Sequence, residues 1–279
     1  MYTKMTIDEI EEYLSSENTS LDICIKNKTN LLKINAKKLQ DEKKANYLWC
    51  LRQIYIIQNL YTKAFKKMKK NEFKEAWNLL DYADINISFL EQNFDIAVEN
   101  DRFHIVFINK MIKEYQKLYP YFLFLSRESI IKSEKCSICG KKISLRNQCG
   151  HKVGKLYMGE LCCRIVTDFE IKATCIVTDP YDKYTVIEVE GKEYNYEAIK
   201  RVISEIDGPY ENFYIKTSFI KKPEFTNISR KSKCPCGSGK KYKNCHLGMK
   251  EELMKHYDII LSKRIDPSKS RMVIYNSWK

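Results

Sequence analysis

The 279-residue chain predicts an α+β protein with three parts: a helical N-terminal domain over 1–120, a small α+β domain over 121–220 nucleated by a cysteine cluster, and a C-terminal part over 221–279. Three observations predict this organisation. Apolar residues recur at helical intervals in the first part, and short β-branched and aromatic runs replace them in the second. Eight of the eleven cysteines fall in two tight groups, which indicates two local sites.

The first part begins with a helix start signal. Thr6 and Glu9 have the spacing of a capping box ahead of apolar residues at helical intervals. A longer helical pattern runs over 30–70, and Asn71 interrupts it, which predicts a helical hairpin. A further helix is expected over 101–118, because a proline follows shortly after it. We therefore expect an ordinary helix bundle.

The second part favours a small sheet with one helix packed on it. The segment from Asn195 to Gly208 has an N-cap residue, an apolar stripe at helical spacing and a Gly-Pro stop. We expect this stripe to cover the sheet. Strands are expected in four runs rich in β-branched and aromatic residues, at 121–126, 172–179, 183–191 and 212–219.

The third part carries most of the positive charge. The net charge is +13, and Lys plus Arg exceed Asp plus Glu by fifteen to five over 221–279, so ten of the thirteen charges lie there. This distribution indicates a negatively charged partner: an acidic protein or a ribosome, with nucleic acid or anionic lipid as alternatives. Residues 220–233 lack periodicity and predict a linker, whereas the apolar spacing over Met249–Ser262 predicts a short helix.

Two features bear on the compartment. No run of about 18 apolar residues occurs, and acidic residues stand where a signal peptide needs an apolar stretch. We therefore expect a cytoplasmic protein without a membrane-spanning segment. In a reducing compartment, clustered cysteines point to metal ligands rather than to disulfides. The sequence gives no indication of the oligomeric state.

The stretch KCPCGSGKKYKNCHLG contains a set of soft metal ligands. Cys234, Cys236, Cys245 and His246 form two close pairs bridged by a glycine-rich turn, and four such ligands fit a tetrahedron around Zn²⁺. A stretch so polar has no core of its own, so the ion is expected to supply the folding free energy, about 10 kcal/mol or more. Some of the lysines offset the negative charge of this structural site, and the others are available to a partner.

From Cys234 to His246 the stretch resembles the SEC-C motif almost residue for residue. SEC-C is a zinc-binding module at the C-terminus of the preprotein translocase ATPase SecA, and it occurs as a detachable module in many bacterial proteins. The resemblance implies zinc on the same four residues and, by analogy with SecA, docking of the chaperone SecB or contact with ribosome or anionic lipid. Leu247 departs from the family pattern, in which glycine often follows the histidine directly. The chain has no nucleotide-binding loop, so the ATPase activity is not implied.

The segment CSICGKKISLRNQCGHKVGKLYMGELCC offers six candidate ligands for a second zinc. Cys136 and Cys139 are the safest, because a CxxCG turn presents both sulfurs to one point. Of the others we favour His151 and Cys162, with Cys149 as a close alternative to either. The last cysteine of the segment is expected to point away as a core thiol. No His-x-Glu pattern of a catalytic zinc is present, so we expect a structural ion that nucleates the α+β domain.

These observations predict a bacterial, non-enzymatic adaptor with two Zn²⁺ ions that docks a partner through its basic module. No nucleophile and base stand at a spacing that indicates catalysis. The expected partner is a protein, such as a chaperone or a ribosome-associated protein. The alternative is a zinc protein that binds nucleic acid, because the ligand spread over 136–162 resembles zinc modules of phage and mobile-element proteins.

Overall fold

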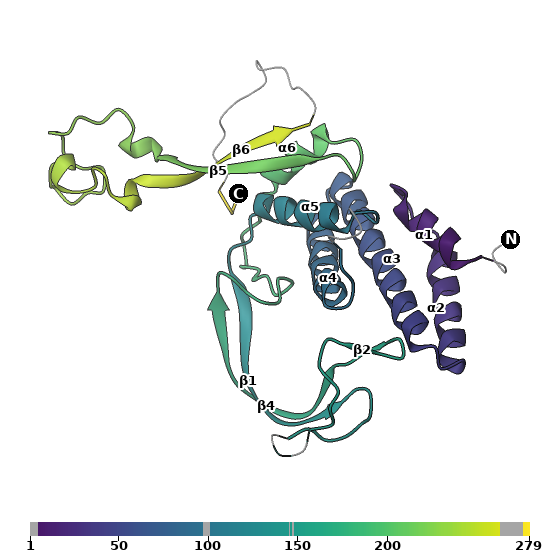
Figure 1. The fold of residues 1–279 in the computed structure, drawn as a ribbon. Helices are drawn as coiled ribbons and strands as arrows, with labels where there is room; N and C mark the ends of the chain where they lie inside the picture. The colour runs from purple at the N-terminus through teal and green to yellow at the C-terminus, as the bar shows by residue number, and fades with distance from the viewer. Residues whose placement is uncertain (1–4, 97–100, 145, 147, 263–275) are drawn as a thin grey trace. The chain divides into compact units, whose positions relative to one another are not determined.

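The computed structural model describes residues 5–96, 101–144, 146, 148–262 and 276–279 (Figure 1). The chain divides into two compact units. The first comprises Met1–Glu211 and Met272–Lys279, and the second comprises Asn212–Arg271. The second unit is therefore an insertion in the chain of the first. Within the described residues, no helix has the length and apolar character needed to cross a membrane.

The first unit contains the predicted helix bundle. Its successive helices are α1 (Ile7–Ser15), α2 (Ile23–Lys38), α3 (Glu42–Lys69), α4 (Phe73–Glu91) and α5 (Ile105–Leu118). The capping box is confirmed, because the Glu9 N–H donates to the Thr6 hydroxyl and the Thr6 N–H donates to the Glu9 carboxylate. The interruption at Asn71 is also confirmed: its φ of 60° lies in the left-handed region, between α3 and α4. Helix α3 packs against α2 and α4 and forms the centre of the bundle.

The pattern over 30–70 forms two helices rather than one. The chain turns at Gln40, whose φ is 57°, and the Asp41 carboxylate then accepts the Lys44 N–H at 3.0 Å. This side-chain cap starts α3. Apolar residues continue at helical spacing on both sides of the break, so periodicity alone predicts one continuous helix.

Helix α6 (Glu197–Glu205) lies where it was predicted but packs elsewhere. Its buried Ile199, Val202 and Ile203 face α3 and α5 instead of a sheet. The Lys69 Nζ at the end of α3 donates to the Ile203 carbonyl at 2.7 Å and thereby caps the helix. The expectation that this stripe covers a sheet is wrong, because the first unit forms two-stranded ribbons too narrow to bury it.

The main ribbon of the first unit pairs β1 (Phe124–Cys136) with β4 (Arg164–Val177) in antiparallel order. Register shifts interrupt the pairing, and most side chains along both strands are exposed. The expected strand over 183–191 does not form. Its strand-like pairing is limited to the start of β1, where the Leu125 N–H donates to the Thr185 carbonyl and Val186 bridges Phe124. The Lys183 carbonyl instead accepts from the Trp77 ring N–H in α4 at 2.7 Å.

At the other end of this ribbon, Cys136 faces Arg164, and the cysteine-rich segment follows. The segment contains a small hairpin of β2 (Leu156–Tyr157) and β3 (Glu160–Leu161). Figure 1 shows β2 lying next to the helices, at the far end of the curved ribbon from α5. The ribbon thus brings the first cysteine cluster back to the bundle.

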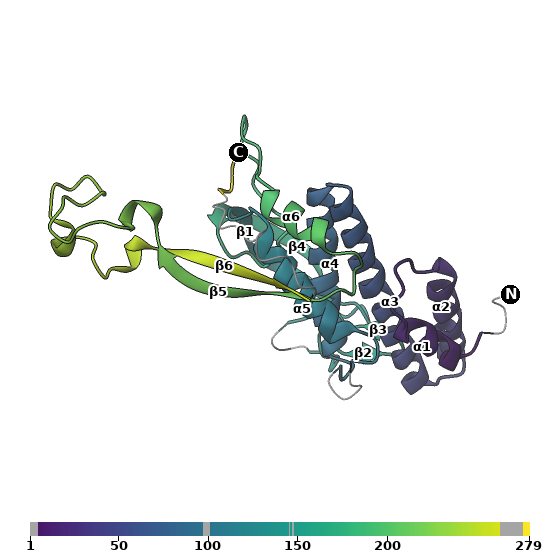
Figure 2. The ribbon, with the colours of Figure 1, turned by 90° about the horizontal axis from the view of Figure 1, so that it is seen from above.

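The second unit is a hairpin of β5 (Phe213–Lys221) and β6 (Leu253–Leu261) that carries the second cysteine cluster in its loop (Figure 2). The helix expected over Met249–Ser262 is wrong. Apart from a short 3-10 turn at Lys250–Glu252, this region forms β6, which pairs residue by residue with β5. The backbone N–H and C=O groups of a strand need hydrogen-bond partners from another strand. For β6 these partners come from β5, about 40 residues earlier in the sequence.

The end of the chain returns to the first unit. The Asn195 N–H donates to the Ser277 carbonyl at 2.9 Å, and the Lys279 N–H donates to the Glu193 carbonyl at 3.0 Å. Trp278 stacks on Tyr194 with ring centroids 4.3 Å apart. The second unit is therefore connected to the first by chain at both of its ends.

Candidate metal centres

The donor atoms of the second cluster converge on one point. Cys234, Cys236, Cys245 and His246 each offer a ligand atom within 4.8 Å of the others. The Cys236 and Cys245 Sγ atoms are 3.5 Å apart, and His246 Nδ1 lies 3.3 Å from Cys234 Sγ and 3.2 Å from Cys245 Sγ. Ligands of a tetrahedral zinc are separated by roughly 3.3–3.8 Å, given zinc–ligand bonds of about 2.0–2.3 Å. The set fits one ion, with the histidine binding through Nδ1.

A glycine-rich turn holds the first two of these cysteines. The Cys234 N–H donates to the Lys240 carbonyl at 2.8 Å, which closes the turn. Gly237 and Gly239 have φ values of 77° and 72°, in the left-handed region where residues with a Cβ are strained. The two glycines therefore allow the chain to wrap around the ligand position.

The Ser238 hydroxyl lies between two of the sulfurs. It is 3.2 Å from Cys236 Sγ and 3.3 Å from Cys245 Sγ. Hydrogen bonds from this hydroxyl and from the Ser238 N–H lower the pKa of Cys236 to about 6. One ligand is therefore a thiolate at neutral pH before any ion binds, as metal coordination requires.

The module has a small core of its own, contrary to the sequence expectation. Phe225 is 5% exposed and stacks on Tyr242, with ring centroids 6.0 Å apart, and its ring lies 5.3 Å from that of His246. Residues 220–233 are therefore part of the module rather than a linker. The other members of the core are Cys234 and the partly buried Ile228, Cys245 and Leu247.

This core is joined to the hairpin by a buried polar contact. The Tyr242 hydroxyl donates to the Glu252 carboxylate and accepts from the Lys221 Nζ at 3.1 Å. The hydrogen bond from Tyr242 lowers the pKa of Glu252. Leu247, the departure from the SEC-C pattern, packs against the same core, so an apolar side chain has a place there.

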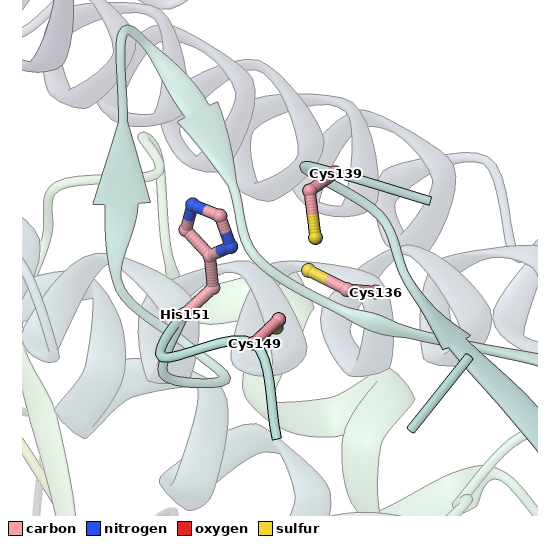
Figure 3. A group of neighbouring side chains, drawn as sticks. All are labelled: Cys136, Cys139, Cys149 and His151. Carbon is pink, nitrogen blue, oxygen red and sulfur yellow. The ribbon is translucent and has the colours of Figure 1, made fainter. Parts of the chain in front are cut away.

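The first centre is formed by Cys136, Cys139, Cys149 and His151, whose ligand atoms also lie within 4.8 Å of one another. In Figure 3 a ring nitrogen of His151 faces the sulfurs. His151 Nδ1 is buried and has no hydrogen-bond partner in the part of the chain that the structure describes. The ring packs edge to face on Tyr157 at 4.6 Å, which fixes its orientation. A buried nitrogen without a partner fits a metal ligand, so this donor set also fits one ion.

The CxxCG turn positions Cys136, the most buried ligand of this centre. The Gly140 N–H donates to the Cys136 carbonyl at 2.9 Å, and Gly140 has a φ of 70°. Backbone N–H groups of Cys139 and Ile138 point at the Cys136 sulfur and lower its pKa to about 6. The turn thus stabilises a thiolate, and this is why CxxCG is informative in a sequence.

Cys162, which the sequence analysis preferred to Cys149, lies beside this group rather than in it. Its Sγ is 3.9 Å from that of Cys136, and burial raises its pKa to about 11. Cys163 was expected to be a core thiol, and this is wrong: Cys163 is exposed. Its N–H donates to the Ser137 hydroxyl at 2.8 Å, which ties its backbone to the edge of the turn.

A buried lysine attaches this centre to the helices. The Lys33 Nζ in α2 donates to the Gly159 carbonyl at 3.1 Å and to Glu160 Oε1 at 3.2 Å. The Gly159 N–H in turn donates to Asn46 Oδ1 at 2.7 Å. Sequence reasoning missed Lys33, although a lysine on the apolar face of a helix is a signal for a buried partner.

The second unit is strongly basic. Lys and Arg outnumber Asp and Glu by eleven to four over 212–262. Six of these cations are exposed around the cysteine-containing loop, and none of the six forms an ion pair with another described residue. We call them the basic cluster: Arg230, Lys231, Lys233, Lys240, Lys241 and Lys243.

Comparisons with known proteins match the second centre to a known motif. The protein translocase subunit SecA of Ehrlichia canis (strain Jake) is 24% identical over 208 residues, and the match covers 64% of this chain and 19% of that protein. No solved structure matches the chain. Residues 230–248 match the model of the SEC-C motif. The chain thus carries a SEC-C motif, together with a second Cys/His group that can hold a metal ion.

Proposed function

We propose that the chain is a non-enzymatic zinc protein that docks an acidic protein partner through its SEC-C module. Each of its two centres offers three thiols and one imidazole, which together fill the four positions of a structural zinc and leave none for a substrate. The ions supply folding free energy to segments whose own cores are small. The zinc therefore shapes the docking surface and takes no part in a reaction.

The observation that carries this proposal is the basic cluster. Its six cations have no acidic partner among the described residues, and a hairpin and a metal-binding turn hold them in place. Opposite charges across an interface accelerate encounter and select the partner. The SEC-C resemblance and the similarity to a translocase subunit favour a chaperone or a ribosome-associated protein as that partner.

Metal content tests the first half of the proposal. Elemental analysis of the purified chain should give about two zinc ions per chain, one for each four-donor set. Replacing Cys236 by Ser should reduce this to about one ion, and so should replacing Cys136 and Cys139 together by Ser, because three donors then remain in the first centre. A chain that binds no zinc would contradict the proposal.

Binding to a purified acidic chaperone, SecB, and to purified ribosomes tests the second half. Neutralising four members of the basic cluster to Gln, at Lys231, Lys233, Lys240 and Lys241, should weaken binding at least tenfold and mainly slow association. The matched control replaces four exposed lysines of the first unit by Gln, at Lys43, Lys44, Lys63 and Lys66, and should bind as the original chain does. Equal affinity of the two variants would refute docking through the basic cluster.

Salt dependence separates the protein partner from nucleic acid. A nucleic-acid complex loses about 0.9 in log K per phosphate contact for each tenfold rise in salt. Single- and double-stranded oligonucleotides should bind this chain more weakly than the acidic protein does. Tighter oligonucleotide binding with that steep slope would instead support the nucleic-acid alternative.

A further inference from the structure

The first metal centre contains one thiol more than a tetrahedral ion needs. Beside the four convergent donors, Cys162 places its Sγ 3.9 Å from Cys136 Sγ. Two sulfurs bound to one zinc at about 2.3 Å are separated by roughly 3.8 Å, so this distance matches one edge of a coordination tetrahedron. Cys162 is 2% exposed, so its thiol is buried beside the four convergent donors.

The backbone holds Cys162 more firmly than it holds the histidine. The Cys162 N–H donates to the Lys155 carbonyl at 2.9 Å, and the Gly154 N–H donates to the Cys162 carbonyl at 2.8 Å. His151 lies in a stretch without strand pairing, and contact of its ring with Tyr157 fixes its side chain. His151 is also the one nitrogen donor among these five side chains. Replacing it by a thiol therefore changes the donor set from three sulfurs and one nitrogen to four sulfurs.

We propose that Cys162 exchanges with His151 as the fourth ligand, so that the centre holds an ion either with three sulfurs and one nitrogen or with four sulfurs. The inference rests on the proposed function, because it requires that this centre binds metal. In the exchange, one metal–sulfur bond forms, one metal–nitrogen bond breaks, and the Cys162 proton passes to water. A site of four thiolates suits a soft ion such as Cd²⁺ better than a site with an imidazole does.

Single and double variants of the full chain test this exchange. His151→Ala and Cys162→Ser should each keep about two zinc ions per chain, because four donors remain in each variant. The double variant should fall to about one ion. The SEC-C centre serves as the internal reference, and Cys163→Ser, a change of the exposed neighbouring thiol, is the matched control and should keep both ions.

Cobalt substitution identifies the ligands directly. With Co²⁺ in both centres, His151→Ala should strengthen the sulfur-to-metal absorption of the first centre by about one third, because four thiolates replace three. Loss of one ion in His151→Ala would overturn the exchange, since Cys162 would then not replace the histidine. Loss of one ion in Cys162→Ser would overturn it as well, because Cys162 would be obligatory. An original chain that binds metal only at its SEC-C centre would refute the proposed function of the first centre itself.

Discussion

Phe225 offers a test of how far the SEC-C module depends on packing as well as on metal. Its ring is 5% exposed and contacts Tyr242 and the histidine ligand His246. Truncating a buried phenylalanine to alanine costs about 3–5 kcal/mol, and this core is small, so we expect the lower value of about 3 kcal/mol for Phe225→Ala. Because zinc binding is coupled to the folding of the module, the loss should appear as zinc affinity weaker by up to about 100-fold.

Chelator competition on the full chain measures this effect, and the first centre provides a reference that the variant leaves unchanged. Phe219→Ala is the matched control, because Phe219 lies on β5 and is 63% exposed. The control should change the affinity less than threefold. A Phe225→Ala variant that binds zinc within threefold of the original chain would show that the four ligands alone determine the fold of the module.

Three further predictions concern the sites. Lys33→Met should lower the free energy of urea unfolding by about 2 kcal/mol, because the buried Gly159 carbonyl loses a charged donor. The control Lys37→Met changes a lysine whose side chain is 38% exposed, and it should lower that free energy by less than about 1 kcal/mol. In the metal-free chain, iodoacetamide should modify Cys236 with a midpoint near pH 6, and Ser238→Ala should raise that midpoint; an unchanged midpoint would contradict the role of the hydroxyl. The pKa of Cys236 in the folded chain lies below the ordinary thiol value of 9.0. The Cys236 thiolate therefore stabilises the metal-free module fully above about pH 9, and this stabilisation is lost as the pH falls to about 6. Circular dichroism of the metal-free chain at different pH values measures the loss.

The features that depend on local sequence were predictable. The capping box at Thr6 and the break at Asn71 need only neighbouring residues, and both were located from spacing. The SEC-C ligands were found in the same way, because a glycine-rich turn brings residues close in sequence to one point. The α+β class with its helical N-terminal region followed from periodicity.

The remaining features depend on partners far along the chain. Strand β6 shows apolar spacing that also suits a helix, and its pairing with β5 decides between them. Spacing did not distinguish Cys149 from Cys162, because the fold of the loop and of the β2–β3 hairpin sets which sulfur reaches the other donors. Phe225 stands in a charged stretch without periodicity, so only its ring contacts reveal it as a core residue.

The insertion of the SEC-C module has a consequence for its survival in the presence of proteases. A zinc module at the end of a disordered tail is lost after one cleavage in that tail. Here the module lies in the loop of a hairpin with nine paired residues on each strand, about 30 Å long. A single cut in the loop leaves each half covalently attached through its own strand, and two cuts are needed to release the zinc-binding segment. Limited proteolysis should therefore nick the chain before it separates the module from the hairpin.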